Sequence, residues 1–254
     1  GTLSPYLKQK PNPSIIFGWN PFLSVYNWSN GNGGLWDRLV KKVGQEPIIY
    51  DADQVESSVD NILDHLEYQG YYGSDVQSDI KVKGKKVSVT YNVTLGRRFP
   101  IEDISIDLPS RGEFRESFLQ DTSAMTVRKG DFLSEAALEK ESERSSAAMR
   151  NVGFYDFNKN YFFFEADTTS YPGKALLKLT VNEYTRNESP RNASPIRKFY
   201  FNDINITYPK SLKIKEKVLR DLTTIYPGDL YGEDKINNTY ARLSALRVFS
   251  SVNI

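Results

Sequence analysis

One alternating pattern of apolar and polar residues occurs twice in the chain, at residues 98–106 (RFPIEDISI) and 198–206 (KFYFNDINI). Phe99 corresponds to Phe199, and the offset of 100 residues (199 − 99) holds along both copies. The alternation predicts a half-buried strand in each copy, because successive side chains of a strand point to opposite faces. A turn and a helical pattern follow each time. Such a repeat predicts tandem modules rather than one large domain.

The residues after the first copy predict the order strand, helix, helix, strand, strand. Helical spacing and cap residues favour helices at 113–121 and 135–151, the second with Ser134 as its N-cap. Two further strands are predicted at 161–167 and 174–183, with a turn near Pro172 and Gly173. The fold class predicted from this order is α+β, with small sheets and two helices on one face of each.

The same elements are expected before and after this module, but incompletely. The first module contains a helix capped by Asp51 or Asp53 and a hairpin, and it lacks an opening strand. The third contains the opening strand and two helices, and it stops inside a strand at 250–254. We therefore predict modules at 1–96, 97–186 and 187–254, with an aromatic insertion at about 14–34 in the first.

Composition narrows the class of protein. Of the 254 residues, 39% are hydrophobic and 26% charged, which is typical of a globular chain. The net charge of +1 provides no long-range field that would favour nucleic acid. The absence of cysteine excludes disulfides, thiolate metal sites and a cysteine nucleophile. No apolar run reaches the roughly 18 residues of a membrane helix.

The search for catalytic and cofactor motifs predicts none. His65 is the single histidine, so a zinc site or an imidazole-based triad has almost no candidates. The glycines at 31, 33 and 34 lack the preceding strand and the following Lys-Ser/Thr of a phosphate loop. We expect no metal, no cofactor and no catalytic residue. One enzymatic alternative stays open, a glycan hydrolase with an aromatic cleft at Trp19, Trp28 and Trp36.

Several short motifs, taken in this order, carry a family resemblance. A helix-ending glycine precedes two aromatics in Gly70-Tyr71-Tyr72 and in Gly153-Phe154-Tyr155, and a Gly-Asp pair precedes the second helix at Gly130 and at Gly228. With the strand–helix–helix–strand–strand order, the chain resembles polypeptide-transport-associated (POTRA) domains of BamA/TamA-like outer-membrane proteins. Residues 9–28 look like the surface antigen relatives of Bacteroidetes-type bacteria.

This resemblance implies tandem POTRA modules, each a three-stranded mixed sheet with two helices on one face. It implies the periplasmic arm of an outer-membrane protein in a Gram-negative bacterium, without catalytic residues. A closing hairpin and a transmembrane β-barrel would follow residue 254, and that barrel would be the membrane contact. The implied partners are unfolded outer-membrane proteins and periplasmic or lipoprotein accessory factors, and nucleic acid is not among them.

Strand addition to a free sheet edge is the expected mode of binding, because main-chain hydrogen bonds demand little sequence specificity. The strand after the second helix of each module is the candidate edge: 75–82, 160–167 and 250–254. Its candidate client-binding residues are Tyr161, Phe162, Phe163, Phe164, Val76 and Ile80. The insertion offers a second surface through Trp19, Phe22, Tyr26 and Trp28. The alternative is a structural spacer that docks partner proteins without binding clients.

Overall fold

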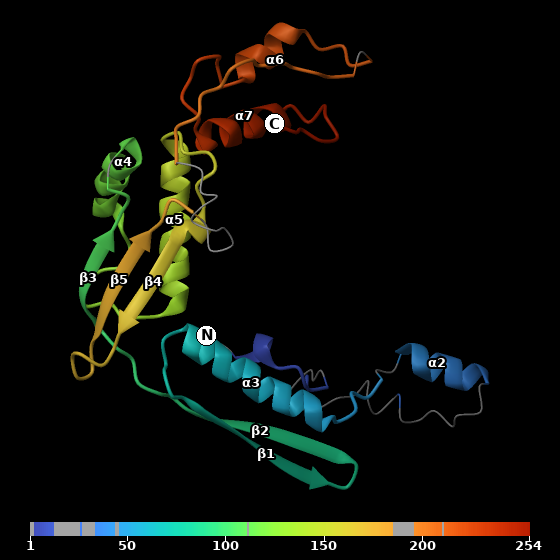
Figure 1. The fold of residues 1–254 in the computed structure, drawn as a ribbon. Coiled ribbons are helices and arrows are strands. Elements are labelled where there is room, and N and C mark those ends of the chain that lie inside the picture. The colour runs from blue at the N-terminus through green and yellow to red at the C-terminus, as the bar shows by residue number, and fades with distance from the viewer. Residues whose placement is uncertain are drawn as a thin grey trace. The chain divides into compact units, whose positions relative to one another are not determined.

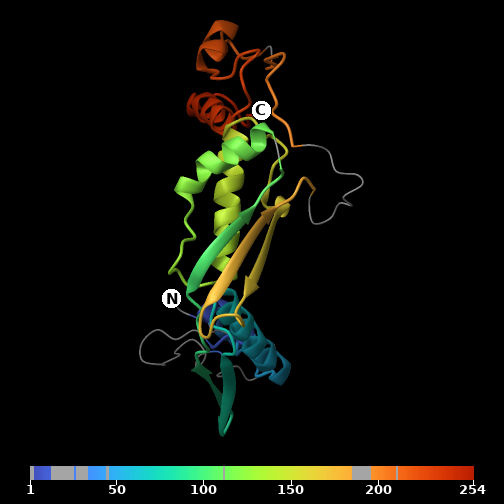
Figure 2. The same cartoon turned by 60° about the vertical axis from the view of Figure 1, so that its left-hand side comes forward.

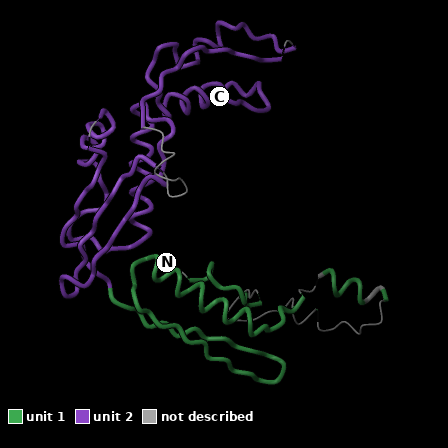
Figure 3. The backbone as a smooth tube through the Cα atoms, in the orientation of Figure 1, with its two compact units in different colours: residues 1–97 green, residues 98–254 purple. Residues whose placement is uncertain are grey.

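The computed structural model describes residues 3–12, 26, 34–43, 46–110, 112–184, 196–209 and 211–254. The chain divides into two compact units, residues 1–97 and 98–254 (Figure 3). The expected boundary after residue 96 lies beside this division, and the expected boundary at 187 stays a prediction within the second unit. Each unit is described separately below.

The first unit is built on a helix and a hairpin. Helix α3 (Ala52–Tyr68) begins at Asp51, whose side chain accepts a hydrogen bond from the Asp53 amide and thereby caps the helix. Strands β1 (Asp75–Lys83) and β2 (Lys86–Thr94) form the expected antiparallel hairpin. Helix α2 (Leu35–Val43) and the 3₁₀ helix η1 (Ser4–Tyr6) precede them.

The core of this unit lies between α3 and the open end of the hairpin, the end away from its turn. Ile62 and Leu66 of α3 pack with Val76 of β1, and all three are buried. His65 stacks on Tyr6 with ring centroids 3.9 Å apart, so the single histidine holds the N-terminal segment on α3. This contact gives His65 a structural role.

The second unit contains a three-stranded mixed sheet in the order β3-β5-β4 (Figure 1). Strand β3 (Ile101–Asp107) runs parallel to the central β5 (Ala175–Val181), and β4 (Phe162–Asp167) runs antiparallel to it. Helices α4 (Glu113–Asp121) and α5 (Glu135–Asn151) pack on one face of the sheet (Figure 2). The predicted fold class, α+β with a mixed sheet and two helices, is confirmed here.

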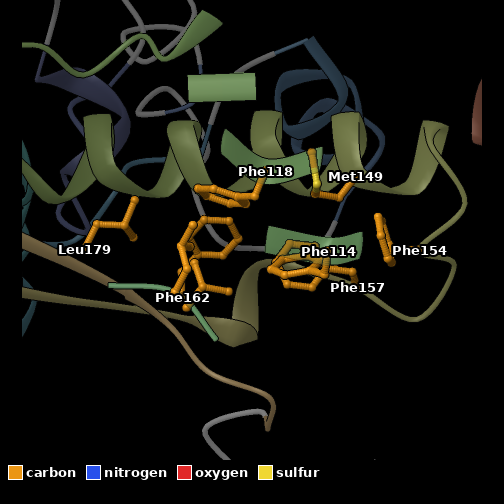
Figure 4. Packing of buried hydrophobic residues seen from close by; sticks show 9 residues of the cluster. Phe114, Phe118, Met149, Phe154, Phe157, Phe162 and Leu179 are labelled. Atoms are coloured by element: carbon orange, nitrogen blue, oxygen red, sulfur yellow. The ribbon is translucent and has the colours of Figure 1, made fainter. Parts of the chain in front are cut away.

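Aromatic residues fill the space between helices and sheet. Phe114 and Phe118 of α4 and Met149 of α5 meet Phe162 of β4 and Leu179 of β5, all of them buried (Figure 4). The rings of Phe118 and Phe162 lie 6.0 Å apart at an interplanar angle of 46°. Such tilted contacts add to the stabilisation from burial itself. The inward residues of β5 are buried along the whole strand.

The sequence repeat is also a repeat of backbone hydrogen bonds. The Phe99 carbonyl accepts from the Leu133 amide and the Phe199 carbonyl from the Tyr231 amide, both at 2.9 Å. In each copy the residue two positions further bonds to the Gly-Asp loop: Ile101 to Gly130 and Asp131, and Phe201 to Gly228 and Asp229. The loop before the second helix therefore recurs because it closes the same contact.

The third expected module departs from prediction in its strands. The two expected helices are present, as α6 (Glu216–Leu222) and α7 (Glu233–Ala245). The predicted strand at 198–206 is reduced to one bridge, Tyr200 to Leu230, and 250–254 forms no strand. Within the described residues these extended segments have no partner strand, and strands exist only as hydrogen-bonded pairs.

Candidate protein-interaction edge

Strand β4 is an outer strand of the sheet in the second unit. It pairs with β5 on one side. On its other side, no strand of the described ranges pairs with it. An outer strand leaves backbone N–H and C=O groups available to another chain. Which residues present these groups depends on the phase of the ladder, meaning which residues of β4 bond to β5 and which point away from it.

The phase is set by one bond at the start of the ladder. The Asn182 amide donates to the Tyr161 carbonyl at 3.1 Å, and this pair continues the register Phe163 to Thr180. Residues opposite each other alternate between bonded and non-bonded pairs in an antiparallel ladder. Residues 163, 165 and 167 therefore direct their backbone groups to β5. Phe164 and Ala166 direct theirs to the outer edge.

The four aromatic residues predicted around this edge have different surroundings. Tyr161 belongs to the 3₁₀ helix η3 (Lys159–Tyr161), and its ring lies 5.1 Å from that of Phe157. Phe162 is 1% exposed and belongs to the core, and its amide donates to the Lys159 carbonyl. Phe163 lies on the opposite face, with its ring 6.1 Å from that of Tyr184.

Phe164 combines an outward backbone with a half-buried ring, which stacks on that of Phe162 at 6.2 Å. The next outward position is Ala166, which is exposed. Sequence reasoning selected aromatics and missed Ala166, whose backbone groups are directed to the outer edge. The signal that identifies it is the ladder phase, which depends on a bond between segments distant in the chain.

The two predicted residues of the first unit also differ. Val76 is buried against Ile62 and Leu66, so its side chain belongs to the core. Ile80 is 41% exposed on the same face of the hairpin. Three predicted residues of the insertion lie outside the described residues: Trp19, Phe22 and Trp28. The fourth, Tyr26, is half-buried. The side chain of Trp36, which was considered for an aromatic cleft, is also outside the described part of the structure.

A tight turn ends the β4 edge. The Asp167 carboxylate accepts from the amides of Thr169 and Ser170 and from both hydroxyls. These bonds favour the charged form and hold the pKa of Asp167 well below its usual value, the Ser170 hydroxyl being the largest cause. The turn thereby fixes where β4 stops.

The opposite edge of the sheet is partly occupied. The loop before α5 bonds to β3 at Ile101, through the Gly130 amide and the Asp131 carbonyl, both at 2.8 Å. Outward groups at the start of β3 are therefore already used. Glu102 binds Lys129 and Lys174 at this end, and the Lys174 and Lys129 contacts lower its pKa.

Among the described residues, no group of three His, Asp or Glu side chains is placed to hold a metal ion. In that same part of the chain, no helix is long and apolar enough to cross a membrane. What the arrangement offers chemically is backbone hydrogen bonding beside aromatic surface.

The family model described as "POTRA: surface antigen variable number repeat" matches residues 30–96. Residues 30–96 are therefore similar to this POTRA family model. The match covers most of the first expected module, and the predicted family is confirmed there. The β-α-α-β-β order of residues 101–181 is the arrangement that was expected of a second POTRA module.

A comparison with solved structures finds similarity at low identity, with TM-scores below 0.5. BamA POTRA domains 3–5 from Haemophilus influenzae give a TM-score of 0.49 at 15% identity, covering 82% of this chain and 79% of that chain. POTRA domains 1–3 of the periplasmic domain of Omp85 from Anabaena give 0.27 at 11% identity, covering 82% and 76%. The N-terminal domain of Omp85 from Thermosynechococcus elongatus gives 0.25 at 14% identity, covering 85% and 82%. No curated protein matches the chain.

Proposed function

We propose that this chain is part of the periplasmic arm of an outer-membrane β-barrel assembly or translocation protein. In this role it binds extended segments of unfolded outer-membrane proteins, or of accessory partners, by strand addition to β4. The POTRA match over residues 30–96 supports the family role. The observation that carries the binding mode is the outer edge of β4, where Phe164 and Ala166 present their backbone groups outward.

The chemistry of the edge explains a broad choice of partners. Hydrogen bonds to the backbone of Phe164 and Ala166 do not depend on the side chains of the partner strand. The core face beside them carries the half-buried ring of Phe164, and the other face carries that of Phe163. A client strand with alternating apolar and polar residues matches this surface, which is the pattern of transmembrane β-strands. Lys178 beside Glu165 keeps the centre of the outer face polar.

The test is photo-crosslinking on the whole chain. A photoreactive residue replaces the exposed Glu165, and a second chain carries it at the exposed Lys140 of α5. The probe is an unfolded peptide with the sequence of one transmembrane β-strand of an outer-membrane barrel. We expect labelling at position 165 well above that at position 140.

A matched pair of variants then isolates the backbone. Ala166→Pro removes an outward N–H while leaving the β4–β5 ladder intact, because proline is tolerated on strand edges. Ala166→Val keeps the N–H and suits a strand. Loss of one backbone bond should reduce labelling about fivefold in Ala166→Pro, at about 1 kcal/mol per bond. Circular dichroism checks that both variants fold.

The spacer alternative has its own structural support in the second unit. Arg150 of α5 binds Glu233 at 2.9 Å, and the Asn151 amide group binds Asp234 at 2.8 Å at the start of α7. These contacts hold the two helices together without any client. Labelling at position 165 no higher than at position 140 would favour this alternative over strand addition.

A further inference from the structure

The half of the β1–β2 hairpin next to its turn has an apolar face that is open to solvent. Ile80 lies opposite Val89 and Val82 opposite Val87, and residues opposite each other share a face. We call these four residues the hairpin patch. Ile80 is 41% exposed, Val82 69% and Val87 37%, while Val89 is half-buried.

The other half of the same face, at the open end of the hairpin, is the core of the first unit. Val76 is buried there, and Tyr91 and Val93 pack against the same cluster beneath α3. In the second unit the inward residues of the central strand β5 are buried throughout. The inward residues of β2 are exposed or half-buried instead, so α3 covers the hairpin only at its open end.

Lysines lie at the turn of the hairpin and on the face opposite the hairpin patch. Residues 81–86 read KVKGKK and hold four of them, with Asp79 as the nearby acid. Asp79 contacts Lys81 at 3.3 Å, and both side chains are largely exposed. Within the described ranges, Lys83, Lys85 and Lys86 form no ion pair. Lys81, Lys83 and Lys86 lie on the face opposite the patch, as the pairings Lys81 to Ser88 and Lys83 to Lys86 require.

We propose that this hairpin tip binds the surface of an anionic lipid bilayer. The hairpin patch enters the boundary between headgroups and acyl chains, and the lysine stems reach back to lipid phosphates. Apolar burial and attraction to anionic lipid act together in such binding, and each lysine near the surface contributes separately. This inference goes beyond the proposed function and does not depend on it.

A bilayer fits the tip better than a protein partner does, for a reason of size. A stable protein interface buries about 800 Å² on each side. Four aliphatic side chains on a two-stranded ribbon supply far less. A lipid surface requires no shape complementarity. The cluster of lysines also complements anionic headgroups directly.

Vesicle co-sedimentation tests the charge requirement. The whole chain is mixed with phosphatidylcholine vesicles that contain phosphatidylglycerol, or with phosphatidylcholine alone. Lys83→Gln, Lys85→Gln and Lys86→Gln together should weaken binding to the anionic vesicles about a hundredfold, at about 1 kcal/mol per lysine. The matched control removes three exposed lysines elsewhere: Lys10→Gln, Lys140→Gln and Lys217→Gln. It should bind nearly as the unchanged chain does.

Insertion of the patch is tested separately. Val82→Thr with Val87→Thr keeps two β-branched residues and should weaken binding about tenfold, since each change replaces a methyl group with a hydroxyl. The chain has no cysteine, so Val82→Cys can carry one environment-sensitive dye. Its emission should shift to the blue with anionic vesicles. The same dye on Ser88→Cys, on the opposite face, should shift less.

Several outcomes would overturn the proposal. Equal binding to both kinds of vesicle would do so, as would equal weakening in the hairpin and control lysine variants. No blue shift at position 82 would remove the insertion step and refute the proposed mode. Binding to polyglutamate without binding to anionic vesicles would instead identify an acidic protein as the partner.

Discussion

Glu141, a buried carboxylate in α5, provides the sharpest test of the packing described above. Its side chain is 2% exposed. It accepts from the Thr126 amide at 2.7 Å and hydroxyl at 2.6 Å, and from the Arg144 guanidinium at 2.7 Å. Arg144 also holds Asp121 at the end of α4, and the Asp121 and Glu141 contacts raise its pKa above the usual value. This group of four residues joins α4, the loop and α5.

Glu141→Ala removes the acceptor for both Thr126 donors and one partner of Arg144. Hydrogen bonds to charged groups contribute about 1.5–3 kcal/mol each. Arg144 keeps Asp121, and the partly exposed Thr126 can turn to water, so the sum is reduced. We expect a loss of about 3 kcal/mol. Glu141→Gln retains an acceptor for Thr126 and should lose about 1–2 kcal/mol.

Hydrogen exchange with mass spectrometry is the suitable assay. The three tryptophans, at 19, 28 and 36, all precede residue 98, so tryptophan fluorescence does not report directly on the second unit. A loss of 3 kcal/mol should lower the protection of α5 amides about a hundredfold, at about 1.4 kcal/mol per factor of ten. Peptides from α3 serve as an internal control. A change of less than about threefold in α5 would refute the reasoning.

Two further substitutions test the core and the α5–α7 contact. Phe162→Ala should destabilise the second unit by about 3–5 kcal/mol in the same assay, because it leaves a cavity beside Phe118, and an unchanged α5 would contradict this. Gly153→Ala should increase exchange in α7, because φ is 106° and a Cβ would lie 2.6 Å from Leu230 Cδ1. Gly130→Ala is the control for backbone strain alone, because its φ is 93° and a Cβ there would meet no atom within 4 Å. If the two glycine variants increase hydrogen exchange equally, the Leu230 contact does not contribute to the effect of Gly153→Ala.

Local signals in the sequence determined most of the helices and the hairpins. The helices at 113–121 and 135–151 have the predicted ends, and Ser134 caps the second through the Ala137 amide. Cap residues act on amides only two or three positions away, so they can be recognised without the fold. The repeat was visible too, and in the structure each copy bonds to its own Gly-Asp loop.

Tertiary structure decided which face of each helix is buried. Val152, the apolar residue that follows α5, is 38% exposed. The helix instead buries Glu141 with Ser142, Ser145 and Ser146. Small serines allow close approach of neighbouring elements, and Asp121 and Thr126 supply partners that lie 15–24 positions from their contacts in α5. Composition alone does not reveal such partners.

The sequence predicted one part of the candidate edge, and the tertiary structure decided the rest. The sequence identified 160–167 as a strand beside a free edge, and the sheet order places β4 there. It could not assign Phe164 and Ala166 as the outward residues, because the ladder phase depends on the bond between Tyr161 and Asn182. For the same reason it overestimated the strand at 198–206. Alternation specifies a strand's two faces, whereas pairing requires a partner brought close by the rest of the fold.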